Sequence, residues 1–168
     1  MATNLSERYR RWFEYERDAH EKVLASLRSV PDVKRAAPEF QKAVSWLAHM
    51  MAARKLWLFR FGVAKEAPTE FFPLSITLEE VTAQVKEIHR IWTDYLCRLD
   101  DAELARVFEY QSLDGPWFRN SVEDILTQLF GHSWYHRGQI AALVRAMGEE
   151  PAVTDFVFWA REPIPPSA

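Results

Sequence analysis

The stretch QLFGHSWYHRGQ, residues 128–139, places His132 and His136 four residues apart. On both sides of it apolar residues recur at helical spacing, namely Val122, Ile125, Leu129, Ile140, Leu143 and Met147. This periodicity predicts a long helix in which the two histidines continue the buried stripe and share one face. Buried imidazoles need partners, so the pair indicates either a metal ion or hydrogen bonds to neighbouring groups.

Working outward, the same periodicity predicts three further long helices, which makes four in all. Thr77 begins a Thr-Leu-Glu-Glu capping box, Ser121 begins a second cap, and Gly62 and Gly148 are typical helix terminators. The helices are expected at about Leu5–Ser29, Pro38–Phe61, Thr77–Leu99 and Ser121–Gly148. Four amphipathic helices of this length predict an all-α fold, a four-helix bundle.

The longest connection lies between the third and fourth predicted helices. It contains a short helical turn at Asp101–Ala105, followed by Val107–Gln111 and Trp117–Asn120 around Asp114-Gly115, which predicts a short hairpin or extended loop. The 168 residues fit one domain, expected over residues 1–162, with residues 163–168 as a flexible tail. Thr154–Trp159 is apolar enough to pack back on the bundle.

Composition excludes several classes of function. The net charge is −3 and no block of Lys or Arg stands out, so we expect no nucleic-acid partner. No apolar run reaches the length of a membrane span and no signal peptide is visible, which predicts a cytoplasmic protein without a membrane partner. The single cysteine, Cys97, cannot form an internal disulfide and is expected to be a small packed side chain.

A metal bound by His132 and His136 would need more protein ligands, because catalytic zinc sites use three. His49 falls on the buried stripe of the second predicted helix and is the best candidate for the third. His20 and His89 fall beside their helix stripes, and a solvated or boundary position is expected for both. The His-Glu-x-x-His motif of zincins is missing, and no histidine follows a Glu at the spacing of di-iron bundles.

These residues together resemble the DinB/YfiT-like family of metal-binding four-helix bundles. His132-Ser-Trp-Tyr-His-Arg-Gly-Gln-Ile140 is similar to the family signature His-x-x-x-His-Arg-Gly-Gln, and Gly148 to Phe156 is similar to the segment that closes such domains. His49, followed eight residues later by Trp57, resembles the pattern of the second family helix. Arg54 departs from relatives that often carry an acidic residue there.

The resemblance implies that His49, His132 and His136 are the ligands of a divalent transition metal, with zinc or nickel expected first and iron or manganese as the alternatives. It also implies a homodimer. Members of the family attach low-molecular-weight thiols to electrophiles, so a thiol S-transferase with a small thiol cosubstrate is the leading expectation. A metal-dependent hydrolase on the same site and a non-catalytic, stress-related metal- or ligand-binding bundle are the alternatives.

Side chains around such a site should orient the imidazoles through their second ring nitrogens. The sequence offers Glu16, Tyr135, Gln139 and Asp155 for this role. Arg137 lies one position off the histidine face. For Arg137 we expect an ion pair with a carboxylate near the end of the chain in preference to an anionic substrate group.

Overall fold

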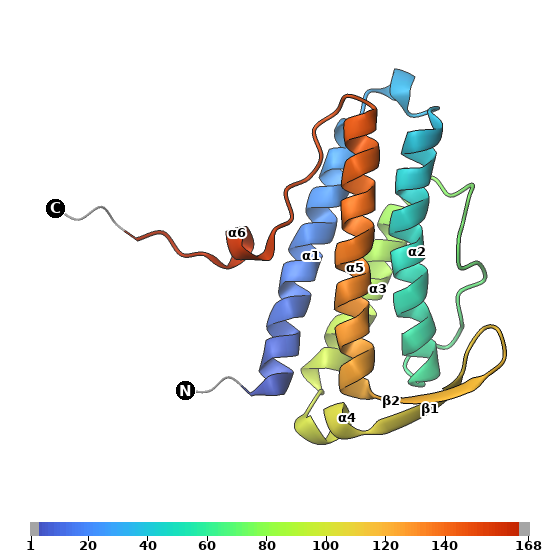
Figure 1. The fold of residues 1–168 in the computed structure, drawn as a ribbon, viewed down its shortest axis with the longest axis vertical. Coiled ribbons are helices and arrows are strands. Elements are labelled where there is room, and N and C mark those ends of the chain that lie inside the picture. The colour runs from blue at the N-terminus through green and yellow to red at the C-terminus, as the bar shows by residue number, and fades with distance from the viewer. Residues whose placement is uncertain (1–3, 165–168) are drawn as a thin grey trace.

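The computed structural model describes residues 4–164 of the chain, and residues 165–168 of the predicted tail lie outside that range. Its four long helices are α1 (Leu5–Ser29), α2 (Pro38–Arg60), α3 (Leu78–Cys97) and α5 (Val122–Ala146). A 3-10 turn (Asp32–Lys34) joins α1 to α2, and the short helices α4 (Asp101–Ala105) and α6 (Phe156–Ala160) complete the helical part. The predicted all-α four-helix bundle is therefore confirmed (Figure 1).

Each long helix packs against two neighbours, so that the helices follow one another around the bundle in the order α1, α3, α2, α5. The most extensive contact is between α2 and α5, the two helices that carry the predicted metal ligands. Residues 61–77 return from the lower end of α2 to the upper end of α3, so these two helices run in the same direction (Figure 1). That long return segment lies beside α2 and reaches the site described below.

Local sequence explains where the helices begin and end. Thr77 and Ser121 both form complete capping boxes. The hydroxyl of each accepts a hydrogen bond from the backbone N–H of the third helical residue, whose carboxylate accepts one from the backbone N–H of the cap residue. Asn4 caps α1, because its side chain accepts from the backbone N–H of Ser6. Gly62 follows α2 with φ of 76°, a backbone conformation that favours glycine.

The core fills the space between the four helices with aliphatic and aromatic side chains. Trp92 on α3 and Leu24 on α1 are among its largest fully buried members. Cys97, expected to be packed, is exposed instead. It is the last residue of α3, where Leu96 and Leu99 take the core-facing positions and leave Cys97 on the outer side. Within residues 4–164 no helix is both long and apolar enough to cross a membrane.

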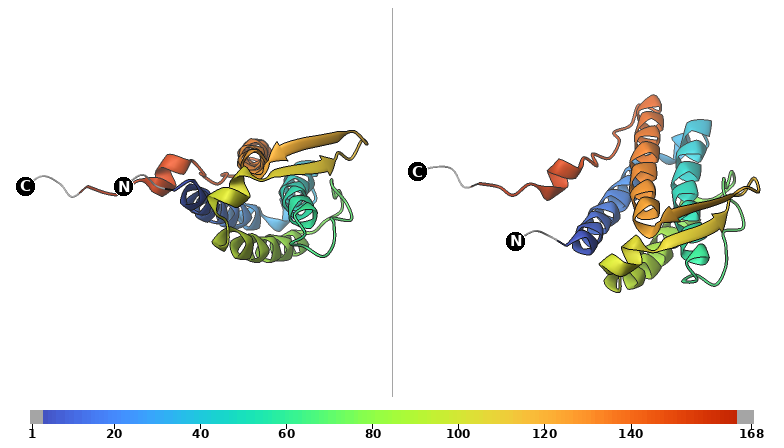
Figure 2. Two further views of the ribbon diagram at one scale, coloured as in Figure 1. Left: turned by 90° about the horizontal axis from the view of Figure 1, so that it is seen from below. Right: turned by 60° about the horizontal axis from the view of Figure 1, so that its bottom comes forward.

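The predicted hairpin consists of strands β1 (Val107–Gln111) and β2 (Trp117–Ser121), paired antiparallel at the lower end of the bundle (Figure 2). On the other side of the molecule, α6 contacts α1 through aromatic packing of Tyr15 with Phe156 and Trp159. No residue of α6 is buried. Tyr15 also donates a hydrogen bond to the carbonyl oxygen of Thr154, and Arg11 lies over the ring of Trp159. Residues 154–159 thus pack on α1 as expected, although the short helix stays on the surface.

Candidate metal centre

The structure brings His49 of α2 together with His132 and His136 of α5. The Nε2 atom of His132 lies 3.0 Å from Nε2 of His49 and 3.0 Å from Nε2 of His136. The three side chains could hold a metal ion, because each can offer one nitrogen and these atoms all lie within 4.8 Å of one another. The group forms because α2 and α5 are direct neighbours and because four residues make about one helical turn.

The second ring nitrogen of His49 is fixed by the return segment between α2 and α3. Its Nδ1 lies 2.8 Å from the carbonyl oxygen of Phe71. A carbonyl oxygen can only accept, so Nδ1 carries the proton and Nε2 of the neutral ring keeps its lone pair. Phe72 stacks on the same ring at 4.2 Å between centroids, which limits rotation of the imidazole.

His136 is held in an equivalent way by its own helix. Its Nδ1 lies 2.7 Å from Oε1 of Gln139, which accepts the Nδ1 proton and leaves Nε2 as the lone-pair nitrogen. Trp46 of α2 stacks on the ring at 4.5 Å between centroids. Hydrogen bonds of this kind to the outer nitrogen are the usual way in which proteins orient metal-binding histidines.

Hydrogen bonding alone does not satisfy the three inner nitrogens. His49 and His136 both present lone pairs to Nε2 of His132, and a neutral His132 can donate at most one proton from that atom. Burial first, and then the positive charges that His136, His49 and Arg54 would carry, lower the pKa of His132 to about 4. At neutral pH the ring is therefore uncharged, and at least one close pair of nitrogens has no proton between them.

A metal ion fits this arrangement. Zinc bound to imidazole nitrogens at about 2.0–2.1 Å in tetrahedral geometry separates its ligand atoms by about 3.3 Å, close to the 3.0 Å found for two of the pairs. Neutral imidazoles suit zinc, copper, iron and nickel, so the donor set indicates a transition metal without selecting one. Within the described residues neither Glu16 nor His20 joins the group as a fourth ligand.

A buried ion-pair cluster lies next to the histidines. Glu16 of α1 has no exposed surface and accepts from two guanidinium groups, Arg54 of α2 and Arg137 of α5. Arg54 also donates to the hydroxyl of Ser133, 3.1 Å away. The pairing of Arg137 with a carboxylate was predicted correctly, but its partner is Glu16 and not a residue near the end of the chain.

His20 and His89 were expected at solvated or boundary positions, and this expectation was wrong. Both are buried, and Nδ1 of His20 lies 2.9 Å from Nε2 of His89. The rings stack at 5.2 Å between α1 and α3, outside the three-histidine group. Helix periodicity placed each residue beside its core stripe, but it could not show that the two side chains meet inside the bundle.

Of the side chains expected around the site, Gln139 bonds to His136, and Tyr135 packs edge-on to the same ring at 5.1 Å. Glu16 binds the two arginines instead of a histidine, and Asp155 is the N-cap residue of α6. Sequence reasoning missed the carbonyl of Phe71, because a backbone acceptor in an irregular segment leaves no side-chain signal.

Comparison with known proteins identifies the family of the chain. Searches of curated proteins and of solved structures each gave no match to the chain. Residues 1–165, nearly the full length of the sequence, match the profile of the DinB family. The predicted resemblance is thus confirmed, and the chain belongs to the DinB family.

Proposed function

We propose that the protein binds a divalent transition metal through His49, His132 and His136 and uses this centre to transfer a low-molecular-weight thiol to an electrophile. The observation that carries the proposal is the convergence of three neutral imidazoles in a group that, among residues 4–164, includes no carboxylate. We expect zinc or nickel first, and iron or manganese as the other metals. Such an ion, when bound, supplies a Lewis acid that lowers the pKa of a thiol or a water molecule.

The protein's own groups favour an anionic reactant at this centre. Three neutral ligands leave the charge of a divalent ion uncompensated by the protein. The buried guanidinium of Arg54 adds positive charge on the inner side, close enough to contribute to the lowered pKa of His132. A thiolate sulfur is therefore a better partner for the site than a neutral group.

The remaining residues keep the centre in one geometry. Phe71 and Gln139 fix the protonated nitrogens of His49 and His136, and Phe72 and Trp46 cover one face of each ring. In the proposed reaction the thiolate sulfur forms a bond to an electrophilic carbon, whose leaving group departs with its electron pair. The thiol proton passes to solvent, so the reaction needs no oxidant or reductant.

The first test is metal content. Protein purified without a histidine tag and reconstituted with zinc or nickel should hold about one ion per chain. His136→Ala should abolish binding, whereas His89→Gln, which changes a buried histidine outside the group, should not. A content below about 0.1 ion per chain after reconstitution, or equal loss in both variants, would show that the proposed ligands are wrong.

The second test separates transfer from hydrolysis. The metal-loaded protein is incubated with 1-chloro-2,4-dinitrobenzene and a panel of small thiols, and thioether formation is followed by absorbance; p-nitrophenyl acetate without thiol is the hydrolysis assay. Thiol-dependent turnover that is lost in His136→Ala supports the proposal. Turnover of the ester alone would point to a hydrolase, and metal binding without either activity would point to a non-catalytic binding bundle.

A further inference from the structure

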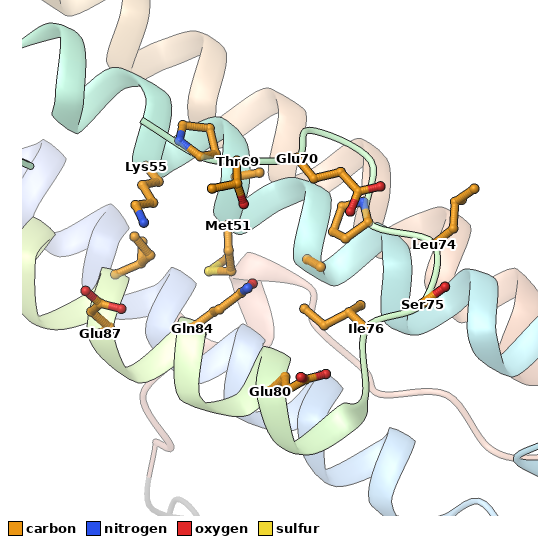
Figure 3. A pocket seen from close by; sticks show the side chains of 15 residues that line it. Met51, Lys55, Thr69, Glu70, Leu74, Ser75, Ile76, Glu80, Gln84 and Glu87 are labelled. Carbon is orange, nitrogen blue, oxygen red and sulfur yellow. The ribbon is translucent and has the colours of Figure 1, made fainter. Parts of the chain in front are cut away.

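A cavity lies between α2 and α3, beneath the return segment that joins them. Its volume is about 610 Å³, and none of the three grouped histidines lines it. This volume falls within the range of small-molecule sites, about 300–1,000 Å³. Figure 3 shows side chains from α2, α3 and the return segment turned toward this common space.

The floor of the cavity is apolar. It is formed by side chains that are almost fully buried in the bundle, namely Ala48, Met51, Ala52, Ile76 and Ile88. One wall contains Pro68 and Pro73, whose rings fix the backbone φ angle and restrict the segment that closes the cavity. A ligand with a short apolar body would remove its own apolar surface from water by packing against this floor. The two prolines restrict the wall before binding, so ordering the wall would cost little free energy.

The rim of the cavity is acidic. Glu70, Glu80 and Glu87 line it together with a single basic residue, Lys55. Among residues 4–164 none of these four side chains forms an ion pair within 4.0 Å. Glu80 accepts two hydrogen bonds from Thr77 in the capping box of α3, so the rim carries three negative charges against one positive charge, with Glu70 and Glu87 free of such bonds within the described part of the chain. In Figure 3 Lys55 and Glu87 lie at one end of the cavity, and Glu80 lies nearer the other end.

We propose that the α2–α3 cavity is a binding site for a monovalent organic cation with a short apolar body. The buried floor takes the apolar body, and the excess of carboxylates on the rim takes the positive charge. The rim would repel a carboxylate ligand of the same length, and a neutral ligand would bind through its contact with the floor alone. This site is separate from the metal centre and does not rest on the function proposed for it.

Isothermal titration calorimetry of the full chain tests the proposal with three probes that share an unbranched chain of six carbons: hexyltrimethylammonium, hexanol and hexanoate. The quaternary cation has no lone pair, so it cannot act as a ligand of a metal at the histidines. We expect one cation per chain, with a dissociation constant at least about fivefold lower than those of the other probes at low salt. Equal or tighter binding of hexanoate or hexanol would overturn the proposal.

Matched variants and methyl NMR locate the site. Glu70→Gln combined with Glu87→Gln should remove the preference for the cation, whereas Glu79→Gln, on α3 but outside the cavity, should preserve it. The methyl signal of Met51 should shift on titration, and that of Met147 should not. The assignment would be refuted if the double variant kept its preference for the cation or if the control lost it equally. It would also be refuted if only the Met147 signal shifted.

Discussion

The Glu16 cluster allows a sharp prediction about stability, because one buried carboxylate is the shared counterion of two buried guanidiniums. Glu16 is fully buried, and the side chains of its partners Arg54 and Arg137 are each 3% exposed. Replacing Glu16 by Gln keeps the shape but leaves two positive charges in the core without a counterion. Removing one partner of a buried ion pair costs about 3–5 kcal/mol.

The expected loss in the free energy of unfolding is therefore at least about 3–5 kcal/mol for Glu16→Gln. In a domain of this size that corresponds to a fall in Tm of about 6–20 °C. Arg54→Met should cost less, about 1–2 kcal/mol, because it leaves a balanced pair of Glu16 and Arg137 and loses mainly the hydrogen bond to Ser133. Repulsion from Arg137 already adds to burial in lowering the pKa of Arg54 to about 9.

Urea unfolding followed by tryptophan fluorescence and calorimetric Tm values measure both variants. Glu14→Gln is the matched control, since Glu14 lies on the same helix in an exposed pair with Arg17 and should change stability by less than about 1 kcal/mol. A Glu16→Gln loss below that of Arg54→Met would refute the reasoning that the cluster has an excess of positive charge.

Three further predictions follow from the histidines and the surface. Burial lowers the pKa of His89 to about 3. The imidazole therefore stays neutral in the folded chain, whereas in the unfolded chain it takes up a proton near pH 6.5. The contribution of His89 to the free energy of unfolding should be complete above about pH 6.5 and fall by about 1.4 kcal/mol per pH unit below it. If urea unfolding shows the same dependence of stability on pH in His89→Gln, this reasoning is contradicted. Gln139→Leu should weaken metal binding by about 10–100-fold in a competition titration, and Gln84→Leu on α3 should not; equal affinities would remove Gln139 from the site. Trp134 and Tyr135 are 49% and 65% exposed on α5, which suits the expected homodimer. Light scattering should then give a mass of twice 19.7 kDa, and a mass of 19.7 kDa alone at micromolar concentration would contradict the dimer.

The parts of the molecule that sequence could predict depend on local patterns. Capping at Thr77 and Ser121, termination at Gly62 and the hairpin each involve residues only a few positions apart. The histidine group was also within reach, because helix periodicity put His49 and the pair on α5 on inward faces of their helices. Their convergence then required only that α2 and α5 be neighbours.

The parts that sequence could not predict depend on how the helices align with one another. His20 meets His89 across 69 positions, and Arg137 meets Glu16 across 121. A side chain beside the core stripe can point into the bundle or toward solvent. Its direction depends on which side chain of the facing helix lies at the same level along the bundle axis. The orientation of His49 depends further on one carbonyl of the return segment, at Phe71.

The sequence His132-Ser-Trp-Tyr-His-Arg contains two polar pairs at helical spacing, offset by one position, and the structure gives each a different partner. His132 and His136 face His49 of α2, whereas Ser133 and Arg137 belong to the buried cluster around Glu16. Consecutive residues differ by about 100° around a helix, so a small rotation of α5 would disturb both sets of contacts together. The ion pair of Arg137 with Glu16 and its hydrogen bond to Tyr15 therefore favour the rotation of α5 in which the two histidines face α2. Arg54, which bonds to both Glu16 and Ser133, ties α2 to the same alignment. The salt-bridge cluster and the histidine group thus depend on the same alignment of α2 and α5.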